Sequence, residues 1–155
     1  MNENPGFDLE LAHRFFSAEC FNRAWDLIDK PSRTPEEDQT MLQLGLTSLW
    51  HWTQRSDRKP INLSVGNWQL SRIYALLGQA DLARLYGQAS LRLSQEEGDF
   101  PFYLGYAYEA LARTESISRD SAKMEEYLQK AQECIEKIPD PDDKQQLLAD
   151  LATIN

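Results

Sequence analysis

The sequence predicts an all-α fold of about seven helices, paired as antiparallel hairpins. Apolar residues recur at three- and four-residue steps through most of the 155 residues, which is the period of a helix with one buried side. Proline, glycine and N-cap residues interrupt that pattern at regular intervals, and no segment alternates as a strand does. The predicted connections are roughly two to eight residues long, so consecutive helices must run antiparallel.

The first helix is expected over residues 9–29. Asp8 precedes its apolar stripe and can accept a hydrogen bond from the free backbone amides of the first turn. Pro31 ends the stripe, because proline cannot continue helical hydrogen bonding. This helix is the first half of an irregular hairpin over residues 8–55.

The second helix has the clearest start in the chain. Thr34 is a suitable N-cap, Pro35 takes the first helical position, and Glu37 lies three residues after the cap. This arrangement is a capping box with an acidic side chain at the positive end of the helix dipole. The helix should continue to about Arg55 and stop at the breaking segment 57–60.

The third and fourth helices are expected over residues 63–77 and 81–96. Gly78 lies between them and suits the left-handed position that closes many helices. Gly98 ends the fourth helix. The two helices form a hairpin over residues 63–96.

The remaining helices complete a single predicted domain over residues 1–155. Their expected ranges are 101–114 and 119–138, which form a hairpin over residues 100–138, and 141–154, which forms a capping helix. Extra residues around 116–121 are expected to lengthen the turn inside that hairpin. Asp140 and Pro141 supply the cap and the first residue of the last helix.

An internal repeat lies in the middle of the chain. Three pairs of like residues are separated by 34 positions: Leu70 and Leu104, Tyr74 and Tyr108, and Leu77 and Leu111. This period and the residue classes resemble the tetratricopeptide repeat, over residues 64–138. The whole chain also resembles small bacterial tetratricopeptide-like proteins through Phe21-Asn22-Arg23-Ala24-Trp25 and His51-Trp52.

That resemblance implies a right-handed superhelix that binds a protein or peptide on its concave face, made mainly by the first helix of each hairpin. The candidate binding residues, expected to be exposed or half-exposed, are Trp68, Arg72, Phe102, Tyr106, Glu109 and Arg113. Aromatic and Arg side chains are common interface anchors. The alternative is that the three aromatic residues simply pack against the long first hairpin.

A second candidate site is a polar and aromatic cavity where the first three helices meet. Its lining residues would be Asn22, Trp25, His51, Trp52, Trp68 and Arg72. A mainly apolar pocket with a few converging polar groups is the usual form of a small-ligand site. The alternative is a structural hydrogen-bond network that satisfies buried polar groups.

The two histidines are expected to meet. If the first two helices pair about the turn near residues 31–34, His13 and His51 lie at the same height, with Glu10 one turn from His13. Two imidazoles and a carboxylate can bind a divalent metal. Hydrogen-bonded or surface histidines without a metal are the favoured interpretation, because no third histidine and no established metal motif accompany them.

Composition narrows the function classes. A net charge of −9 and a pI of about 4.7 disfavour nucleic-acid binding. Cys20 and Cys134 lie within helical patterns and belong to no metal-binding cluster, so both are expected in the core. No secretory leader and no apolar run of membrane-spanning length is apparent. We therefore expect a cytoplasmic protein without a membrane segment.

No pattern of catalytic residues is present, since the chain lacks a phosphate-binding glycine loop and a nucleophile elbow. The leading hypothesis is a non-enzymatic interaction module without a cofactor or metal. The alternatives are a small-ligand sensor that uses the cavity and a self-associating structural protein, which would be a homo-oligomer. Substituting Arg72 and Arg113 with Ala is expected to abolish partner capture without unfolding the protein.

Overall fold

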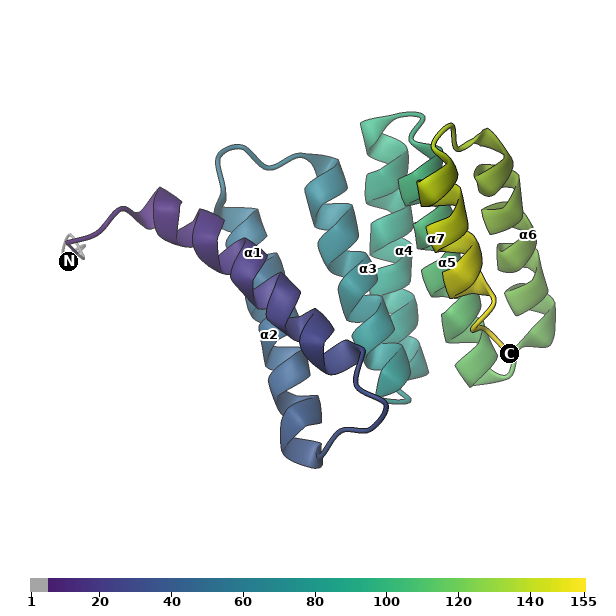
Figure 1. Cartoon of the computed structure of the whole chain (residues 1–155), viewed down its shortest axis with the longest axis horizontal. Coiled ribbons are helices and arrows are strands. Elements are labelled where there is room, and N and C mark those ends of the chain that lie inside the picture. The colour runs from purple at the N-terminus through teal and green to yellow at the C-terminus, as the bar shows by residue number, and fades with distance from the viewer. Residues whose placement is uncertain (1–5) are drawn as a thin grey trace. The chain divides into compact units, whose positions relative to one another are not determined.

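The computed structural model describes residues 6–155 and confirms the all-α prediction (Figure 1). Seven helices and no strands occur in this part of the chain. The helices are α1 (Leu9–Ile28), α2 (Pro35–Gln54), α3 (Pro60–Leu76), α4 (Ala80–Glu97), α5 (Pro101–Ser118), α6 (Ser121–Lys137) and α7 (Pro141–Leu151).

The helices form two compact units. The first unit, Met1–Arg58, contains α1 and α2, and the second unit, Lys59–Asn155, contains α3 to α7. Each unit has its own helix pairings, and each is described by itself. The boundary falls in the charged segment that follows α2, where the sequence also predicted a break.

The first unit is a hairpin held by buried small polar groups. Ser48 Oγ in α2 donates to the backbone oxygen of Ser17 in α1, at 2.7 Å. Arg55 Nη1, just after α2, donates to Ser17 Oγ at 3.0 Å. Because Ser17 and Ser48 are small and buried, the two helices approach closely at this point.

The predicted helix caps are confirmed. Asp8 accepts from the backbone amide of Leu11, and Asp140 accepts from the amides of Asp142 and Asp143. Thr34 and Glu37 accept from each other's backbone amides, which completes the capping box. These contacts join residues two or three positions apart, so the local sequence is enough to predict them.

The helix α3 begins three residues earlier than expected. Pro60 was interpreted as a breaker, but it occupies the first helical position, where its missing amide hydrogen is not needed. The backbone amide of Lys59 donates to Asn62 Oδ1 at 2.9 Å and fixes this start. The break after α2 is therefore also the start of the second unit.

Two hairpins of the second unit contain the same contact. Tyr74 of α3 stacks on Tyr86 of α4 with ring centres 5.4 Å apart, and Tyr108 of α5 stacks on Tyr127 of α6 at 6.3 Å. The second pair is seven positions further apart in the sequence than the first. That difference matches an insertion of about seven residues, as the sequence predicts around 116–121.

The inserted residues lengthen the helix α5 rather than the turn. The helix α5 continues to Ser118, one turn beyond the predicted end, and α6 begins at Ser121. Between them Arg119 takes the left-handed conformation, with φ of 63°. Its amide bonds to carbonyls of the last turn of α5, so a short reversal suffices where we had expected a longer loop.

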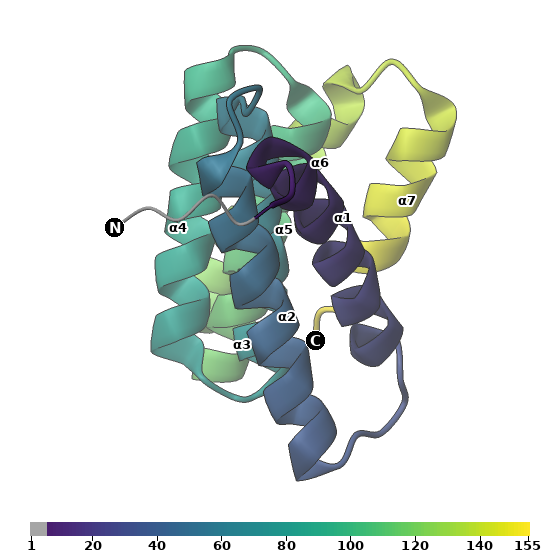
Figure 2. The same ribbon diagram turned by 90° about the vertical axis from the view of Figure 1, so that its left-hand side faces the viewer.

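The helix α7 covers α5 and α6 (Figure 2 shows α7 and α4 on opposite sides of the second unit). Leu147 of α7 is fully buried in a cluster with Tyr106, Ile135 and Ile138. Gly105 of α5 makes room for it: a Cβ at Gly105 would lie 2.6 Å from Leu147 Cδ2 and 3.3 Å from Cys134 Cβ. The close approach of α7 to α5 therefore depends on this glycine.

Gly105→Ala is expected to lower the free energy of unfolding by about 1–2 kcal/mol, as measured by urea denaturation. Overpacking against Leu147 outweighs the helix propensity gained, which is worth up to about 1 kcal/mol. Adding Leu147→Val should restore part of the loss, because the shorter side chain lacks the Cδ2 methyl that the new Cβ at position 105 would meet. A Gly105→Ala protein more stable than the wild type would contradict this packing.

Both cysteines are buried and unbonded, as predicted. Burial raises the pKa of each thiol, which disfavours the reactive thiolate at neutral pH. Among the described helices, none combines the length and the apolar character that crossing a bilayer requires.

Candidate interaction surface

The residues predicted for a concave face are brought together in the second unit. Trp68 and Arg72 lie on α3, and Phe102, Tyr106, Glu109 and Arg113 lie on α5. In each helix they are spaced by three or four positions, which places them on one side of that helix. Three of them, Trp68, Arg72 and Arg113, converge on the carboxylate of Glu109.

Glu109 is fully buried and is surrounded by donors. Trp68 Nε1 donates to Oε2 at 3.0 Å, and Arg113 Nε donates to Oε1 at 2.8 Å. Arg72 Nη2 forms an ion pair with Oε1 at 3.5 Å. A buried carboxylate needs such partners, because an unpaired charge in the interior is very unfavourable.

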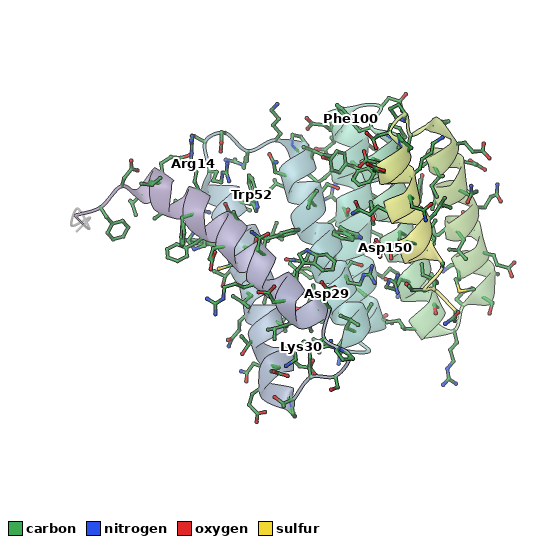
Figure 3. The ribbon with its side chains drawn as sticks, viewed as in Figure 1. Arg14, Asp29, Lys30, Trp52, Phe100 and Asp150 are labelled. Carbon is green, nitrogen blue, oxygen red and sulfur yellow. The ribbon has the colours of Figure 1, made fainter. Side chains whose placement is uncertain are left out.

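The other half of the network belongs to the end of the chain. Asp150 of α7 accepts from Tyr106 Oη at 2.7 Å and from Arg72 Nη2 at 3.2 Å (Figure 3 labels Asp150). Arg113 Nη2 donates to the backbone oxygen of Asp150 at 3.1 Å and to Thr153 Oγ1 at 2.8 Å. Two arginines thus face two carboxylates, and the network is neutral overall.

The aromatic residues pack beside this network. Tyr106 makes edge-to-face contacts with Trp68 and with Phe102, each with ring centres 5.0 Å apart. Trp68 and Phe102 also pack on the cluster around Leu147. Burial, followed by the hydrogen bond to Asp150, raises the pKa of Tyr106 and keeps its hydroxyl protonated as a donor.

Two of the six residues are less accessible than expected. Tyr106 is only 6% exposed and Glu109 is fully buried, whereas we had expected exposed or half-exposed side chains. The α7 contacts through Leu147 and Asp150 account for part of this burial. The repeat spacing placed the residues on one shared side of α3 and α5, but it did not indicate that the capping helix contacts that side.

Asp150 and Thr153 belong to the network but were not predicted from the sequence. The only signal was their position in a predicted amphipathic helix of residues 141–154, where a carboxylate one turn after Leu147 shares its side of the helix. One donor of the network has no acceptor: Nε of Arg72 is buried without a hydrogen-bond partner among residues 6–155.

The residues predicted for a ligand cavity fall into both units. Asn22, Trp25, His51 and Trp52 are in the first unit, and Trp68 and Arg72 are in the second. Within the first unit Asn22 is exposed. The Trp25 ring packs edge-to-face on the Phe21 ring, with the ring centres 6.4 Å apart. The Arg55 guanidinium stacks over the Trp52 ring at 3.8 Å. Trp68 and Arg72 both reach Glu109, as described above.

The predicted meeting of the two histidines is confirmed. Nδ1 of His13 and Nδ1 of His51 lie 2.8 Å apart, within hydrogen-bonding distance, in a partly buried position between α1 and α2. Glu10 does not join them, because its carboxylate accepts from the backbone amide and hydroxyl of Ser56. Residues 6–155 contain no group of three or more His, Cys, Asp or Glu side chains suited to a metal ion.

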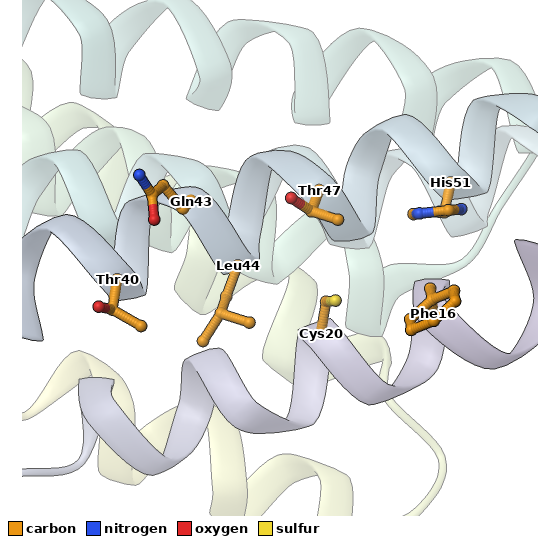
Figure 4. A pocket seen from close by; sticks show the side chains of 7 residues that line it. All are labelled: Phe16, Cys20, Thr40, Gln43, Leu44, Thr47 and His51. Carbon is orange, nitrogen blue, oxygen red and sulfur yellow. The ribbon is translucent and has the colours of Figure 1, made fainter.

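An open groove of about 420 Å³ lies beside the histidine pair, between α1 and α2. It is lined by Phe16, Cys20, Thr40, Gln43, Leu44, Thr47 and His51. Figure 4 shows Leu44 of α2 and Phe16 and Cys20 of α1 in the space between the two helices. Of the residues predicted for a cavity, only His51 lines this groove.

Comparisons with protein-family models, with curated proteins and with solved structures found no match. Membership in the tetratricopeptide family and the right-handed superhelix therefore stay predictions from the sequence. The candidate surface rests on the contacts around Glu109.

Proposed function

We propose that this protein is a non-enzymatic interaction module that binds a helical segment of a partner protein on the side of the second unit formed by α3 and α5. The observation that supports this is the way this surface holds α7. Aromatic side chains, two arginines and a tyrosine hydroxyl contact a short helix near the end of the chain. These are the residue types that dominate binding energy at protein interfaces.

The contacts with α7 suggest the chemistry of the partner. A bound helix would present an apolar residue followed three positions later by a carboxylate, as Leu147 and Asp150 do. Without the Asp150 carboxylate, Arg72 and Arg113 face only Glu109, which leaves one uncompensated positive charge. A partner carboxylate restores neutrality and offers an acceptor to Arg72 Nε.

A partner on this surface must compete with α7. The helix α7 is attached to the same chain, so its local concentration at the surface is on the order of millimolar. A free helix binds only in proportion to the fraction of molecules whose α7 is released. Weakening the α7 contact should therefore tighten binding of the free helix.

A fluorescent peptide of residues 139–155 serves as the probe, added to the full-length chain and followed by anisotropy. Asp150→Asn in the chain, but not in the peptide, should lower the apparent Kd of the peptide about tenfold or more, because hydrogen bonds to a charged group are worth about 1.5–3 kcal/mol. The matched control is Asp142→Asn in the chain, since Asp142 lies on the same helix and takes no part in the network.

The same substitution in the peptide tests the recognition. A peptide with Asp150→Asn should lose at least part of the gain, because it brings no charged acceptor to Arg72. If no saturable binding is found with either chain at millimolar peptide, α7 is a permanent part of the fold and the proposed binding surface is wrong.

A further inference from the structure

The first unit contains a polar contact that the proposed function does not use. His13 and His51 are the only histidines in the chain, and they contact each other across α1 and α2 through their Nδ1 atoms. A hydrogen bond between two Nδ1 atoms requires that one ring donates and the other accepts. The contact can therefore form with one shared proton between the two Nδ1 atoms, but not with one proton on each.

The surroundings of the pair are aromatic and partly buried. The Phe16 ring lies 5.4 Å from the His51 ring, and the Trp50 ring lies 5.5 Å from the His13 ring. Phe16 is 44% and Trp50 54% exposed, so the rings shield the pair from water only in part. Two imidazolium rings with their Nδ1 atoms 2.8 Å apart would lose their hydrogen bond, because both atoms would carry a proton, and the two like charges would repel each other.

The charged groups at this end of the hairpin do not change in the range where histidine titrates. Glu10 and Arg14 lie on α1, and Arg55 and Asp57 follow α2. Hydrogen bonds from Ser56 lower the pKa of Glu10, and Arg55 lowers that of Asp57 to about 2. Both carboxylates stay ionised at pH 5 to 7, so these four groups keep their charge in the range where the histidine pair changes its own.

We propose that the His13–His51 pair is an acid-sensitive clasp that holds the beginning of α1 against the end of α2 and releases it when both rings are protonated. At neutral pH the shared proton joins the helices. After the second protonation the beginning of α1 separates from α2, and Phe16 and Trp50 lose their packing against the rings.

The direction of the pH dependence follows from linkage. Burial, followed by the charge of His13, lowers the pKa of His51 in the folded chain. Below the ordinary histidine pKa of about 6.5 the unfolded chain then binds more protons than the folded chain. The stabilisation is complete above that pH and is lost as the pH falls through the lowered pKa of the folded state.

The wild-type chain allows a direct test, because its two imidazoles are the only ones present. In an NMR titration from pH 8 to pH 4.5, their signals should show two apparent pKa values at least about one pH unit apart, as expected of coupled sites. Over the same range, backbone hydrogen exchange in residues 9–16, corrected for intrinsic rates, should lose protection. The loss should be about tenfold if the lower of the two pKa values lies one pH unit below that of a free histidine. Residues 101–118 of α5 are the internal reference.

His13→Asn and His51→Asn, singly and together, separate the clasp from general acid sensitivity. The double variant should have the same protection of residues 9–16 at pH 5 and pH 7.5. Two histidines that titrate together near pH 6.5, or protection of residues 9–16 that does not change with pH in the wild type, would overturn the proposal. The titration uses only the wild-type chain, so it decides the question even if a variant does not fold.

Discussion

Substituting Arg84 with Ala is expected to lower the free energy of unfolding by about 3 kcal/mol. Arg84 of α4 forms a two-pronged ion pair with Glu115 of α5, with Nε to Oε1 at 2.8 Å and Nη2 to Oε2 at 3.0 Å. Glu115 is 1% exposed, so removing the guanidinium leaves its carboxylate buried, with Ser118 as its one remaining side-chain donor among residues 6–155. This loss of free energy is at the low end of the range for breaking a buried ion pair, because the Arg84 side chain is 28% exposed.

Chemical denaturation measures this loss, and the chain offers a matched control. Arg92 also lies on α4 but pairs with Glu96 at 3.9 Å, with both side chains more than half exposed. Arg92→Ala should therefore change stability by less than about 0.5 kcal/mol. Adding Glu115→Gln to Arg84→Ala should recover part of the loss, because it removes the unpaired charge. Equal effects of the two Arg substitutions would show that the α4–α5 pair is not a buried interaction.

Substituting Arg113 with Ala is expected to have a similar effect, of about 3 kcal/mol. Arg113 is the closest charged partner of the fully buried Glu109, and it also contacts the end of α7. Arg72 remains as a second cation, but its nearest nitrogen is 3.5 Å from that carboxylate. The loss should be visible in denaturation curves, together with faster hydrogen exchange in residues 141–151.

A double-mutant cycle separates the two contributions of Arg113. If the unpaired Glu109 carboxylate is the main cause, Arg113→Ala combined with Glu109→Gln should be more stable than Arg113→Ala alone. Thr153→Val, which removes one acceptor at the α7 end, should cost less than about 1.5 kcal/mol. An Arg113→Ala protein as stable as the wild type would contradict the description of the network.

These contacts correct one expectation from the sequence. Substituting Arg72 and Arg113 with Ala was expected to remove partner binding without unfolding the protein. Because both arginines neutralise a buried carboxylate, the double variant should be strongly destabilised, and loss of binding would then have two explanations. Asp150→Asn in α7 is the better probe, since it changes the occupant of the surface and leaves the surface itself intact.

The sequence by itself determined the helices and most of their ends. Caps such as Thr34 with Glu37, and Asp140, join residues two or three positions apart, so their contacts are visible in the order of residues. The three- and four-residue spacing of apolar side chains is also visible in the order of residues, and it predicts that each helix has one buried side. Three helix ends were misplaced: the start of α3 at Pro60, the end of α5 after residue 114, and the end of α7, which stops at Leu151 and not at residue 154. At Pro60 the local sequence fits both a break and a helix start. After residue 114 it fits both a longer helix and a longer turn.

The sequence also predicted that His13 and His51 would meet, because one short turn joins their helices and determines which residues lie at the same height. The order of residues could not show that their Nδ1 atoms face each other within an aromatic setting. That detail depends on side-chain packing between α1 and α2.

Only the tertiary structure decided that the predicted interaction surface is in contact with the protein's own last helix. Arg72 and Asp150 are 78 positions apart, and Trp68 and Glu109 are 41 apart. Contacts at such separations depend on where whole helices pack, and that is decided by the sum of many apolar contacts around residues such as Gly105 and Leu147. Neither the apolar period nor a helix cap shows how whole helices pack against one another. The sequence therefore indicated which side of each helix is buried, and the fold determined which helix lies against that side.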